Sequence, residues 1–498
     1  MNVNPITRLD YPDPDVIRVE DTYYMVSTTM HFMPGCEILQ SFDLVHWEHV
    51  TYVYETLDHT DAQQLKSGQN IYGQGMWAAS LRYHEGRFYI CFVANDTRKT
   101  YLYTSEKIDG PWKKQLIEGF YHDGSLLFDE DGRNYIVYGN DEIWITELNE
   151  DLTAPKKDGL HRLLVSDHKN PELGYEGSHI QKINGYYYIF LIHSLRDRWM
   201  RTEACFYSDS LEGEFTGGDV LCDDRGYCGQ GVAQGGIVDT PDGKWYAMLF
   251  QDSGAVGRIP ILLPVTWKDH FPLFGQNGHV PEEIEVHSTR PGYIYQPLVG
   301  SDDFCNGLLP RWQFNHDPDP RYYHLDALQG TYTITTREVC TELTQAVNTL
   351  TQRMSYPSCA AEVTVDASAL KEGDVAGLCA LQGCYAAVGI TKHHGKYEVL
   401  MLDKKEDGIL DMTEGTVVES HQMDFRLEAD FCNMKDEARC YYRVNKGDWL
   451  PIGTVHKLYF KLDHFTGCRF GLFCYAAEET GGSACFRDFK YYDVDEIS

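Results

Sequence analysis

Three acidic residues occupy matching places in the first half of the sequence. Asp123 and Glu176 each lie twelve residues before the key tyrosine of a recurring turn-and-strand pattern, which is Tyr135 in one repeat and Tyr188 in the other. Asp13 lies eleven residues before the key tyrosine, in a repeat whose turn we count as one residue shorter. Acids that serve only as turn residues have no reason to share such an offset. We therefore interpret the three acids as a functional set whose side chains converge in the folded chain.

Most glycoside hydrolases break a sugar bond with two carboxyl groups, one a protonated acid and the other a base or nucleophile. Inverting enzymes hold the two groups roughly 6.5–9.5 Å apart, which leaves room for a water molecule. A third carboxylate beside the acid favours its protonated form by like-charge repulsion. Asp13, Asp123 and Glu176 can fill these roles, so the sequence favours glycoside hydrolysis.

A repeat of aromatic hairpins must bring these acids together. In four of the five repeats a turn rich in Asp, Asn, Glu or Gly precedes an aromatic residue pair, and in the third it precedes the pair Asn134-Tyr135, a pattern typical of a β-hairpin. The second residue of each pair is a tyrosine, and these tyrosines are 46 to 65 residues apart: Tyr24, Tyr89, Tyr135, Tyr188 and Tyr246. This spacing fits one four-stranded propeller blade per repeat, whereas a β-sandwich gives turns about every 8–12 residues.

The same count places Trp77 in the second repeat and Gln234 in the fifth. We expect all five positions to be structurally equivalent and to surround one end of the propeller axis. Trp77 taken alone is more often a core residue than a platform for a sugar. Its place in this set favours the sugar platform.

Ordered motifs resemble glycoside hydrolase family 43 over nearly the whole chain. They include Tyr-Pro-Asp-Pro-Asp-Val-Ile-Arg-Val from Tyr11, His-Asp-Gly-Ser-Leu from His122, Tyr-Glu-Gly-Ser-His from Tyr175 and Gly-Arg-Ile-Pro-Ile-Leu-Leu-Pro from Gly257. The resemblance implies an inverting exo-glycoside hydrolase. Its substrates would be terminal β-D-xylosyl or α-L-arabinofuranosyl residues of xylan- or arabinan-derived oligosaccharides. Sequence motifs do not separate the two sugars.

The resemblance also implies a role for each acid. Asp13, in the Pro-Asp-Pro turn, would be the general base. Asp123 would be the pKa modulator and would orient the substrate, and Glu176 would be the general acid.

The residues that bind the sugar follow from the resemblance as well. Arg258 corresponds to an arginine that contacts the sugar in relatives, and Trp77 and Phe32 correspond to walls of the −1 subsite. Many members carry a His in the fifth blade that helps to hold calcium or water in the central channel. Gln234 stands at that position here, which argues against calcium. We predict no metal site and no required cofactor, and we include Gln234 among the substrate-binding residues.

A second domain is expected after the propeller. Short alternating strand patterns separated by polar turns are typical of a β-sandwich, and this part resembles the concanavalin-like jelly roll of family 43 xylosidases and arabinofuranosidases. We therefore predict an all-β chain with a five-bladed β-propeller over residues 1–297 and a β-sandwich over residues 298–498. Segment 312–316 is the candidate for a sandwich loop that closes the pocket, with packing against the propeller as an equal alternative.

The composition limits the partners. A net charge of −32 disfavours nucleic acid and anionic membranes, and it suits a neutral or cationic ligand or simply good solubility. No run of about 18 apolar residues and no leader-like N-terminus is present, and the 15 cysteines lie mostly in apolar runs without Cys-x-x-Cys pairs. We expect reduced thiols and a cytoplasmic protein. The sequence leaves open whether the chain forms a homo-oligomer.

Two other functions deserve comparison. A β-fructosidase-like hydrolase would share a propeller, three acids and a sandwich, but its Asn-Asp-Pro-Asn-Gly and Arg-Asp-Pro motifs are absent. A non-catalytic sugar-binding propeller would not need acids at all three repeat positions. Both alternatives are therefore less favoured than the xylosidase or arabinofuranosidase.

Overall fold

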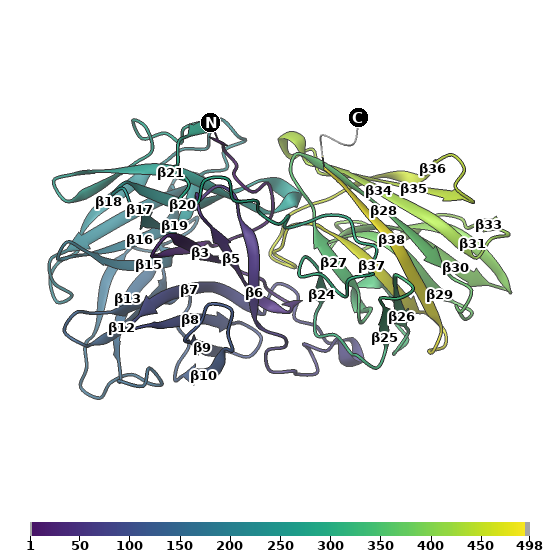
Figure 1. Cartoon of the computed structure of the whole chain (residues 1–498), viewed down its shortest axis with the longest axis horizontal. Helices are drawn as coiled ribbons and strands as arrows, with labels where there is room; N and C mark the ends of the chain where they lie inside the picture. The colour runs from purple at the N-terminus through teal and green to yellow at the C-terminus, as the bar shows by residue number, and fades with distance from the viewer. Residues whose placement is uncertain (1, 494–498) are drawn as a thin grey trace.

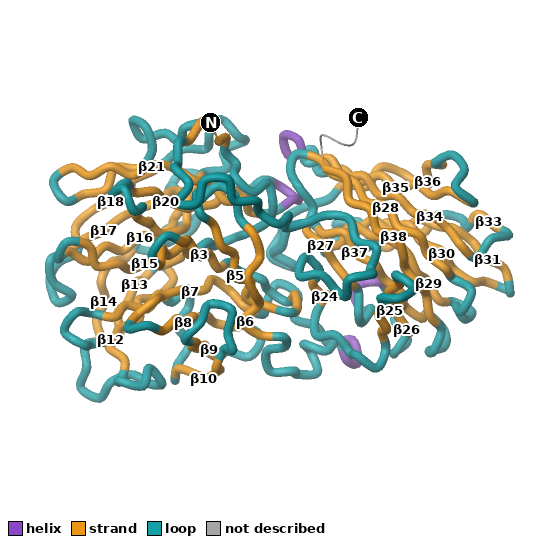
Figure 2. The backbone as a smooth tube through the Cα atoms, viewed as in Figure 1, coloured by secondary structure: helices purple, strands orange, loops and turns teal. Residues whose placement is uncertain are grey.

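The computed structural model describes residues 2–493 as a β-propeller and a β-sandwich that lie side by side (Figure 1). Strands form almost all of the regular structure (Figure 2). This confirms the predicted fold class. The helices of the described residues are four 3-10 turns: η1 (Lys66–Gly68), η2 (Gly254–Val256), η3 (Leu343–Gln345) and η4 (Cys432–Met434).

Five antiparallel sheets of four strands form the propeller blades. In chain order, blade 1 contains β2 (Asp15–Val19), β3 (Thr22–Val26), β5 (Gly35–Ser41) and β6 (Glu48–Tyr54), and blade 2 contains β7 (Met76–His84), β8 (Arg87–Ala94), β9 (Lys99–Ser105) and β10 (Lys113–Ile117). Blade 3 contains β11 (Ser125–Phe128), β12 (Asn134–Asn140), β13 (Glu142–Leu148) and β14 (His161–Ser166). Blade 4 contains β15 (Glu176–Ile183), β16 (Tyr186–Ser194), β17 (Arg201–Ser208) and β18 (Thr216–Leu221), and blade 5 contains β19 (Val232–Asp239), β20 (Trp245–Asp252), β21 (Arg258–Lys268) and β22 (Phe271–Phe274).

The first strand of each blade lines the central axis. Strands β2, β7, β11, β15 and β19 contact one another around a closed ring. Separate apolar clusters fill the spaces between neighbouring blades, and the predicted hairpin tyrosines contribute to them, as Tyr24 and Tyr135 do. The apolar pattern of the repeat therefore packs blade against blade, and the residues at the start of the inner strands remain free to face the axis.

The N-terminal segment closes the ring. Strand β1 (Asn2–Val3) pairs with β23 (Glu283–Ile284), which follows the last blade. The side chain of Asn4 donates to the carbonyl of Leu262 and accepts from its N–H, at 2.7 and 3.1 Å. These bonds attach the chain ahead of Asp13 to blade 5, so residues of the first and fifth blades meet at the axis.

Two antiparallel sheets form the sandwich. The first contains β32 (Leu410–Met412), β31 (Lys396–Lys404), β30 (Tyr385–His393), β29 (Asp374–Leu381), β37 (Arg469–Ala476), β27 (Leu350–Arg353), β24 (Gln313–Asn315) and β4 (Phe32–Met33), with β33 (Thr416–Val418) paired to β31. The second contains β25 (Tyr323–Asp326), β26 (Thr331–Thr335), β38 (Ser483–Asp493), β28 (Ser358–Asp366), β34 (Gln422–Asp430), β35 (Glu437–Val444) and β36 (Leu450–Lys457).

The two domains are joined by shared structure. Strand β4 belongs to the propeller chain but pairs with β24 of the sandwich, so that Phe32 lies opposite Asn315. The apolar residues of η2, from blade 5, belong to the main core of the sandwich. A buried ion pair of 2.9 Å joins Glu37 to Arg353 across the junction. The sandwich is thus fixed against one side of the propeller.

Two further properties concern the whole chain. All fifteen cysteines are unpaired in the described chain and ten of them are buried, as expected for reduced thiols. None of the helices among residues 2–493 has the length and apolar character needed to cross a membrane.

Candidate active site

All three predicted carboxylates lie at the start of inner strands and at one end of the axis. Asp13 and Asp123 each stand two residues before β2 and β11, and Glu176 is the first residue of β15. The backbone N–H of Gly177 donates to Asp123 Oδ2 at 3.0 Å, and the charges of both Glu176 and Asp13 act on the Asp123 carboxyl. The predicted convergence of these three acids is therefore found in the structure.

The predicted equivalence of the five positions is wrong in two blades. In each blade, the hairpin tyrosine pairs with one residue of the inner strand, and the residue four positions before that partner has a left-handed backbone. These five left-handed residues are Asp13, Ala78, Asp123, Gly177 and Gln234. Trp77 and Glu176 precede the left-handed residue of their blade by one position. The reason is turn length, because the second and fourth blades have the same two-residue turn as the first, whereas the third and fifth have longer turns.

Asp13 is held as a hydrogen-bond acceptor. Its Oδ1 lies 2.9 Å from the Nη1 of Arg258, and its Oδ2 accepts a hydrogen bond of 2.5 Å from the Thr28 hydroxyl. Both groups are donors, and Asp13 is only 6% exposed. Asp13 is thus a hydrogen-bond acceptor that two donors from distant parts of the chain hold in place.

Arg258 brings together the propeller and the sandwich. Its backbone N–H donates to Asp10 Oδ1 at 2.7 Å, and the other oxygen of Asp10 accepts from the N–H of Gly467 in a sandwich loop. The ring of Phe465 in that loop lies 4.2 Å from the guanidinium carbon. Within residues 2–493, Arg258 Nε and Nη2 are buried without a hydrogen-bond partner. Two donors therefore remain available beside Asp13.

A sandwich loop does reach the end of the axis where the acids lie, but it is not the predicted one. Phe465 is half-buried, and its ring lies 5.4 Å from that of Trp77. In the predicted segment 312–316, Trp312 and Phe314 are instead buried in the sandwich core. Because β24 pairs with β4, this segment has the alternative role of packing against the propeller.

Asp123 and Glu176 share a positively charged neighbour. His122 Nε2 lies 3.5 Å from Asp123 Oδ2 and 3.4 Å from Glu176 Oε2. The negative charge of Asp123, with help from Glu176, raises the pKa of His122 to about 9. Burial raises the pKa of Asp123 to about 6, and His122 partly opposes this shift. Asn140 Nδ2 also donates to Glu176 Oε2, at 2.8 Å.

These side chains favour proton chemistry over metal binding. Ligand atoms of His122, Asp123 and Glu176 lie within 4.8 Å of one another, as in many metal sites. A protonated imidazole carries hydrogen on both nitrogens and has no lone pair for a metal. At neutral pH the charge of Asp123 keeps His122 in that form, so the residues do not fit a metal ion.

The central channel does not fit calcium. Asp15 is completely buried there, and although burial opposes it, Arg82 and His179 hold the pKa of the Asp15 carboxyl below its usual range. Arg82 donates to Asp15 Oδ2 and to the carbonyls of Leu126 and Ile180. The oxygens that a calcium ion would need are thus bonded to a guanidinium.

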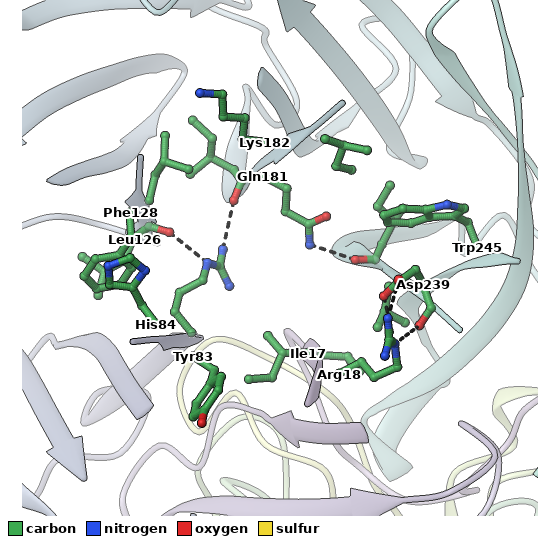
Figure 3. A pocket seen from close by; sticks show the side chains of 17 residues that line it. Ile17, Arg18, Tyr83, His84, Leu126, Phe128, Gln181, Lys182, Asp239 and Trp245 are labelled. Atoms are coloured by element: carbon green, nitrogen blue, oxygen red, sulfur yellow. Dashed lines mark hydrogen bonds and ion pairs between the residues drawn. The ribbon is translucent and has the colours of Figure 1, made fainter. Parts of the chain in front are cut away.

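Arg82 also closes the far end of the channel. Beyond it lies a cavity of about 400 Å³ at the opposite face of the propeller. Figure 3 shows residues of all five blades around this cavity, among them Ile17, Tyr83, Phe128, Lys182 and Trp245. The catalytic end and this cavity are therefore separated by hydrogen-bonded side chains.

The remaining predicted residues lie near the site in different ways. Trp77 is half-buried, and its Nε1 has no hydrogen-bond partner in the described part of the chain. The side chain of Gln234 lies against Gly177, next to Glu176. Phe32 is 1% exposed and is covered by Arg469, whose guanidinium carbon lies 3.5 Å from its ring. Contacts of Phe32 and Gln234 with a sugar stay predictions.

Sequence reasoning missed four residues of the site: Thr28, His122, Asn140 and Phe465. His122 directly precedes Asp123 in a motif already described, and a titratable histidine beside a predicted catalytic acid could have been recognised as a candidate site residue. Thr28 and Asn140 lie outside the repeat offset, and Phe465 comes from the other domain, so no spacing in the sequence pointed to them.

Comparison with known proteins finds relatives that match this chain over both domains. The chain is similar to a Formosa agariphila protein named beta-xylosidase, with 27% identity over 99% of this chain and 89% of the relative. It is also similar to xylosidase/arabinosidase 43B of Humicola insolens, with 26% identity over 98% and 96% of the two chains. Among solved structures, a bifunctional GH43-CE protein of Bacteroides eggerthii matches with a TM-score of 0.93 and 42% identity. The match covers 100% of this chain and 64% of that longer protein.

Family models cover both domains. Residues 301–492 match the beta xylosidase C-terminal concanavalin A-like domain. Residues 3–272, more than half of the chain, match glycosyl hydrolases family 43. The chain is therefore a glycoside hydrolase and belongs to glycosyl hydrolases family 43.

Proposed function

We propose that this glycoside hydrolase acts by inversion and releases terminal β-D-xylosyl or α-L-arabinofuranosyl residues from short oligosaccharides. The observation that carries the proposal is the contrast between two carboxyl environments. Asp13 accepts hydrogen bonds from Arg258 and Thr28, whereas Glu176 lies next to Asp123 at the same end of the axis. Such a pair suits a base and an acid on opposite sides of a glycosidic bond.

The proposed reaction is a single displacement. Asp13 takes a proton from water as the water oxygen bonds to the anomeric carbon. The bond from that carbon to the leaving oxygen breaks, and the proton of Glu176 passes to this oxygen. Asp123 orients the sugar and adjusts the protonation of Glu176, while Arg258 donates hydrogen bonds to the sugar from Nε and Nη2.

The closed side of the site supports exo-action. Phe465 covers Arg258 and packs near Trp77, so a sandwich loop bounds the sugar pocket on that side. A pocket bounded in this way suits the end of a chain better than its middle. The two curated relatives described above carry xylosidase and arabinosidase names, which supports the two sugar classes.

Two measurements test this function. We expect turnover of 4-nitrophenyl β-D-xylopyranoside or 4-nitrophenyl α-L-arabinofuranoside, with the new anomer inverted in proton NMR of the first product. Retention of configuration would instead support the β-fructosidase-like alternative. Absence of turnover on both glycosides, together with binding of the sugars, would support a non-catalytic propeller.

A pair of variants tests the acid. We expect Glu176→Gln to lose about 10²–10⁴-fold in kcat on the nitrophenyl glycoside, as is usual when a general acid is removed. Asp13→Asn should lose at least as much. The matched control is Glu212→Gln, an exposed residue in the β17–β18 turn of the same blade, which should keep full activity. Undiminished turnover in Glu176→Gln would reject the assignment of the acid.

A further inference from the structure

His122 has contacts that the proposed mechanism does not yet use. It directly precedes Asp123, and its carbonyl accepts the N–H of Gly139 from β12, which fixes its backbone. Its side chain is 21% exposed and points Nε2 between the carboxyl oxygens of Asp123 and Glu176. A histidine held between two catalytic acids affects the charge and the geometry of both.

The contacts of Glu176 distinguish its two carboxyl oxygens. Oε2 receives the Asn140 amide at 2.8 Å and lies 3.4 Å from His122 Nε2. Two donors occupy the acceptor positions of Oε2, and a proton on that oxygen would point at one of the donors. The proton of the acid form therefore belongs on Oε1. This oxygen remains the one that can face a leaving group.

The charges around His122 are all negative. The carboxylates of Asp123, Glu176 and Asp13 act on its imidazole, and each raises the pKa of His122. The other side chains that face it are neutral: the Asn140 amide shares Glu176 Oε2, and the Trp77 ring lies 6.2 Å from the His122 ring. No cation among these neighbours competes with the imidazolium for the two acids.

We propose that His122 is a positioning residue for the general acid: its imidazolium holds Glu176 Oε2, directs Oε1–H at the leaving oxygen and stabilises the carboxylate left after proton transfer. This proposal rests on the proposed function. In the step itself, the Oε1 proton moves to the leaving oxygen as the glycosidic bond breaks, and the negative charge that appears on Glu176 faces His122 and Asn140. A proton from solvent restores the acid for the next turnover.

The test uses His122→Gln, which keeps an amide donor without the charge, and His122→Phe, which removes both. On the 4-nitrophenyl glycoside that the enzyme cleaves, we expect His122→Gln to lose about tenfold in kcat and His122→Phe about 100-fold. KM should change less than about twofold, because His122 acts through Glu176 and not on the sugar. The control is His161→Gln, an exposed histidine on β14 that should keep full activity.

Two readouts separate this role from simple structural damage. A 2,4-dinitrophenyl glycoside needs little help from an acid, so the loss in both variants should shrink to less than about threefold. The decline of kcat/KM at high pH should move to higher pH by about one unit in His122→Gln, since removal of a cation favours protonated carboxyl groups. The proposal would be overturned if kcat fell equally on the 4-nitrophenyl and 2,4-dinitrophenyl glycosides and the high-pH decline of kcat/KM stayed at the same pH.

A third measurement is independent of turnover. NMR titration of labelled histidines should show His122 with a pKa of about 9 in the wild-type protein. The value should fall most in Asp123→Asn and less in Glu176→Gln, in line with the strengths of the two charges. A His122 that titrates near its ordinary value would overturn the proposal even if the enzyme is active. If His122 titrates near pH 9 but no glycoside is turned over, the result would count against the proposed function only.

Discussion

Arg258 is buried with two of its guanidinium nitrogens unpaired within residues 2–493, an arrangement that costs stability unless a ligand satisfies them. The guanidinium contacts Asp13 on one side and the ring of Phe465 on another. An aromatic face beside a cation attracts it by roughly 0.5–2 kcal/mol and also excludes water. Phe465 therefore helps to hold the guanidinium of Arg258 beside Asp13, although it comes from the second domain.

At the residue scale, we predict that Phe465→Ala lowers kcat/KM by about tenfold, mostly through a higher KM. The reason is lost stacking and cation–π contact, together worth about 1–1.5 kcal/mol. Leu462→Ala is the matched control, because Leu462 lies in the same loop and is 70% exposed. Steady-state kinetics of both variants on the preferred nitrophenyl glycoside give the comparison. Equal KM values for the two variants would show that Phe465 does not line the sugar site.

At the scale of elements, the inner strands of the second, fourth and fifth blades begin with a bulge. In β15 the pairing with β16 shifts between Glu176 and His179, and the left-handed residue is Gly177. Bulges redirect side chains at the ends of strands, often next to active sites. Here the bulge aims Glu176 at the axis and presents the Gly177 N–H to Asp123.

We predict that Gly177→Ala loses about 10- to 100-fold in kcat, because an alanine is strained at this positive φ and the packing leaves no room for its methyl group. Gly177 has φ of +64°, and an added Cβ would lie 2.7 Å from side-chain carbons of Gln234. Gly185→Ala is the control, since Gly185 has φ of +85° with nothing within 4 Å of its added Cβ. It should lose only about 1 kcal/mol of stability and keep its activity. Steady-state kinetics measure the loss in kcat, and urea unfolding measures the loss in stability. Similar losses in kcat for Gly177→Ala and Gly185→Ala would contradict this account.

The repeat explains why the blades and the acids could be predicted, and where the prediction had to fail. The aromatic hairpins mark the second strand of each blade. Counting back from their tyrosines gives Asp13 and Asp123 at the positions that the structure makes equivalent. A constant offset assumes equal turns, whereas the left-handed residue of the inner strand stands eleven residues before the tyrosine after a two-residue turn and twelve after a longer one. Trp77 and Glu176 stand at the predicted offset, which is one residue before the position that the structure makes equivalent.

At the scale of the whole molecule, the site depends on contacts between distant parts of the chain. Asp10 binds the N–H groups of Arg258 and Gly467, and Tyr11 bonds to the Arg258 carbonyl. No local pattern signals such contacts, because each joins segments more than 200 residues apart. The choice of sandwich loop therefore could not be made from the sequence, whereas the existence of a sandwich could.

The same junction contains three buried histidines. His31 comes from the propeller, and His316 and His464 come from the sandwich; the ring of His31 lies 4.9 Å from His316 and 5.9 Å from His464. Burial lowers the pKa of all three, that of His464 to about 4. Arg469 adds to this effect at His31 and Lys404 adds to it at His464, while Asp463 opposes it. All three imidazoles are therefore neutral in the folded protein at pH 7.

Neutral burial of these histidines predicts that acid weakens the junction. A histidine in the unfolded chain takes up a proton below about pH 6.5, whereas the folded form of His464 resists this until about pH 4. The stability is therefore fully present above pH 6.5 and is lost as the pH falls toward 4, by up to about 1.4 kcal/mol per pH unit for each histidine. Urea unfolding gives the free energy of unfolding, which should fall between pH 7 and pH 5. In His464→Asn the slope of this fall should be smaller than in the wild type by the equivalent of about one bound proton. The exposed His324→Gln should match the wild-type slope, and an unchanged slope in His464→Asn would show that this histidine is not buried in its neutral form.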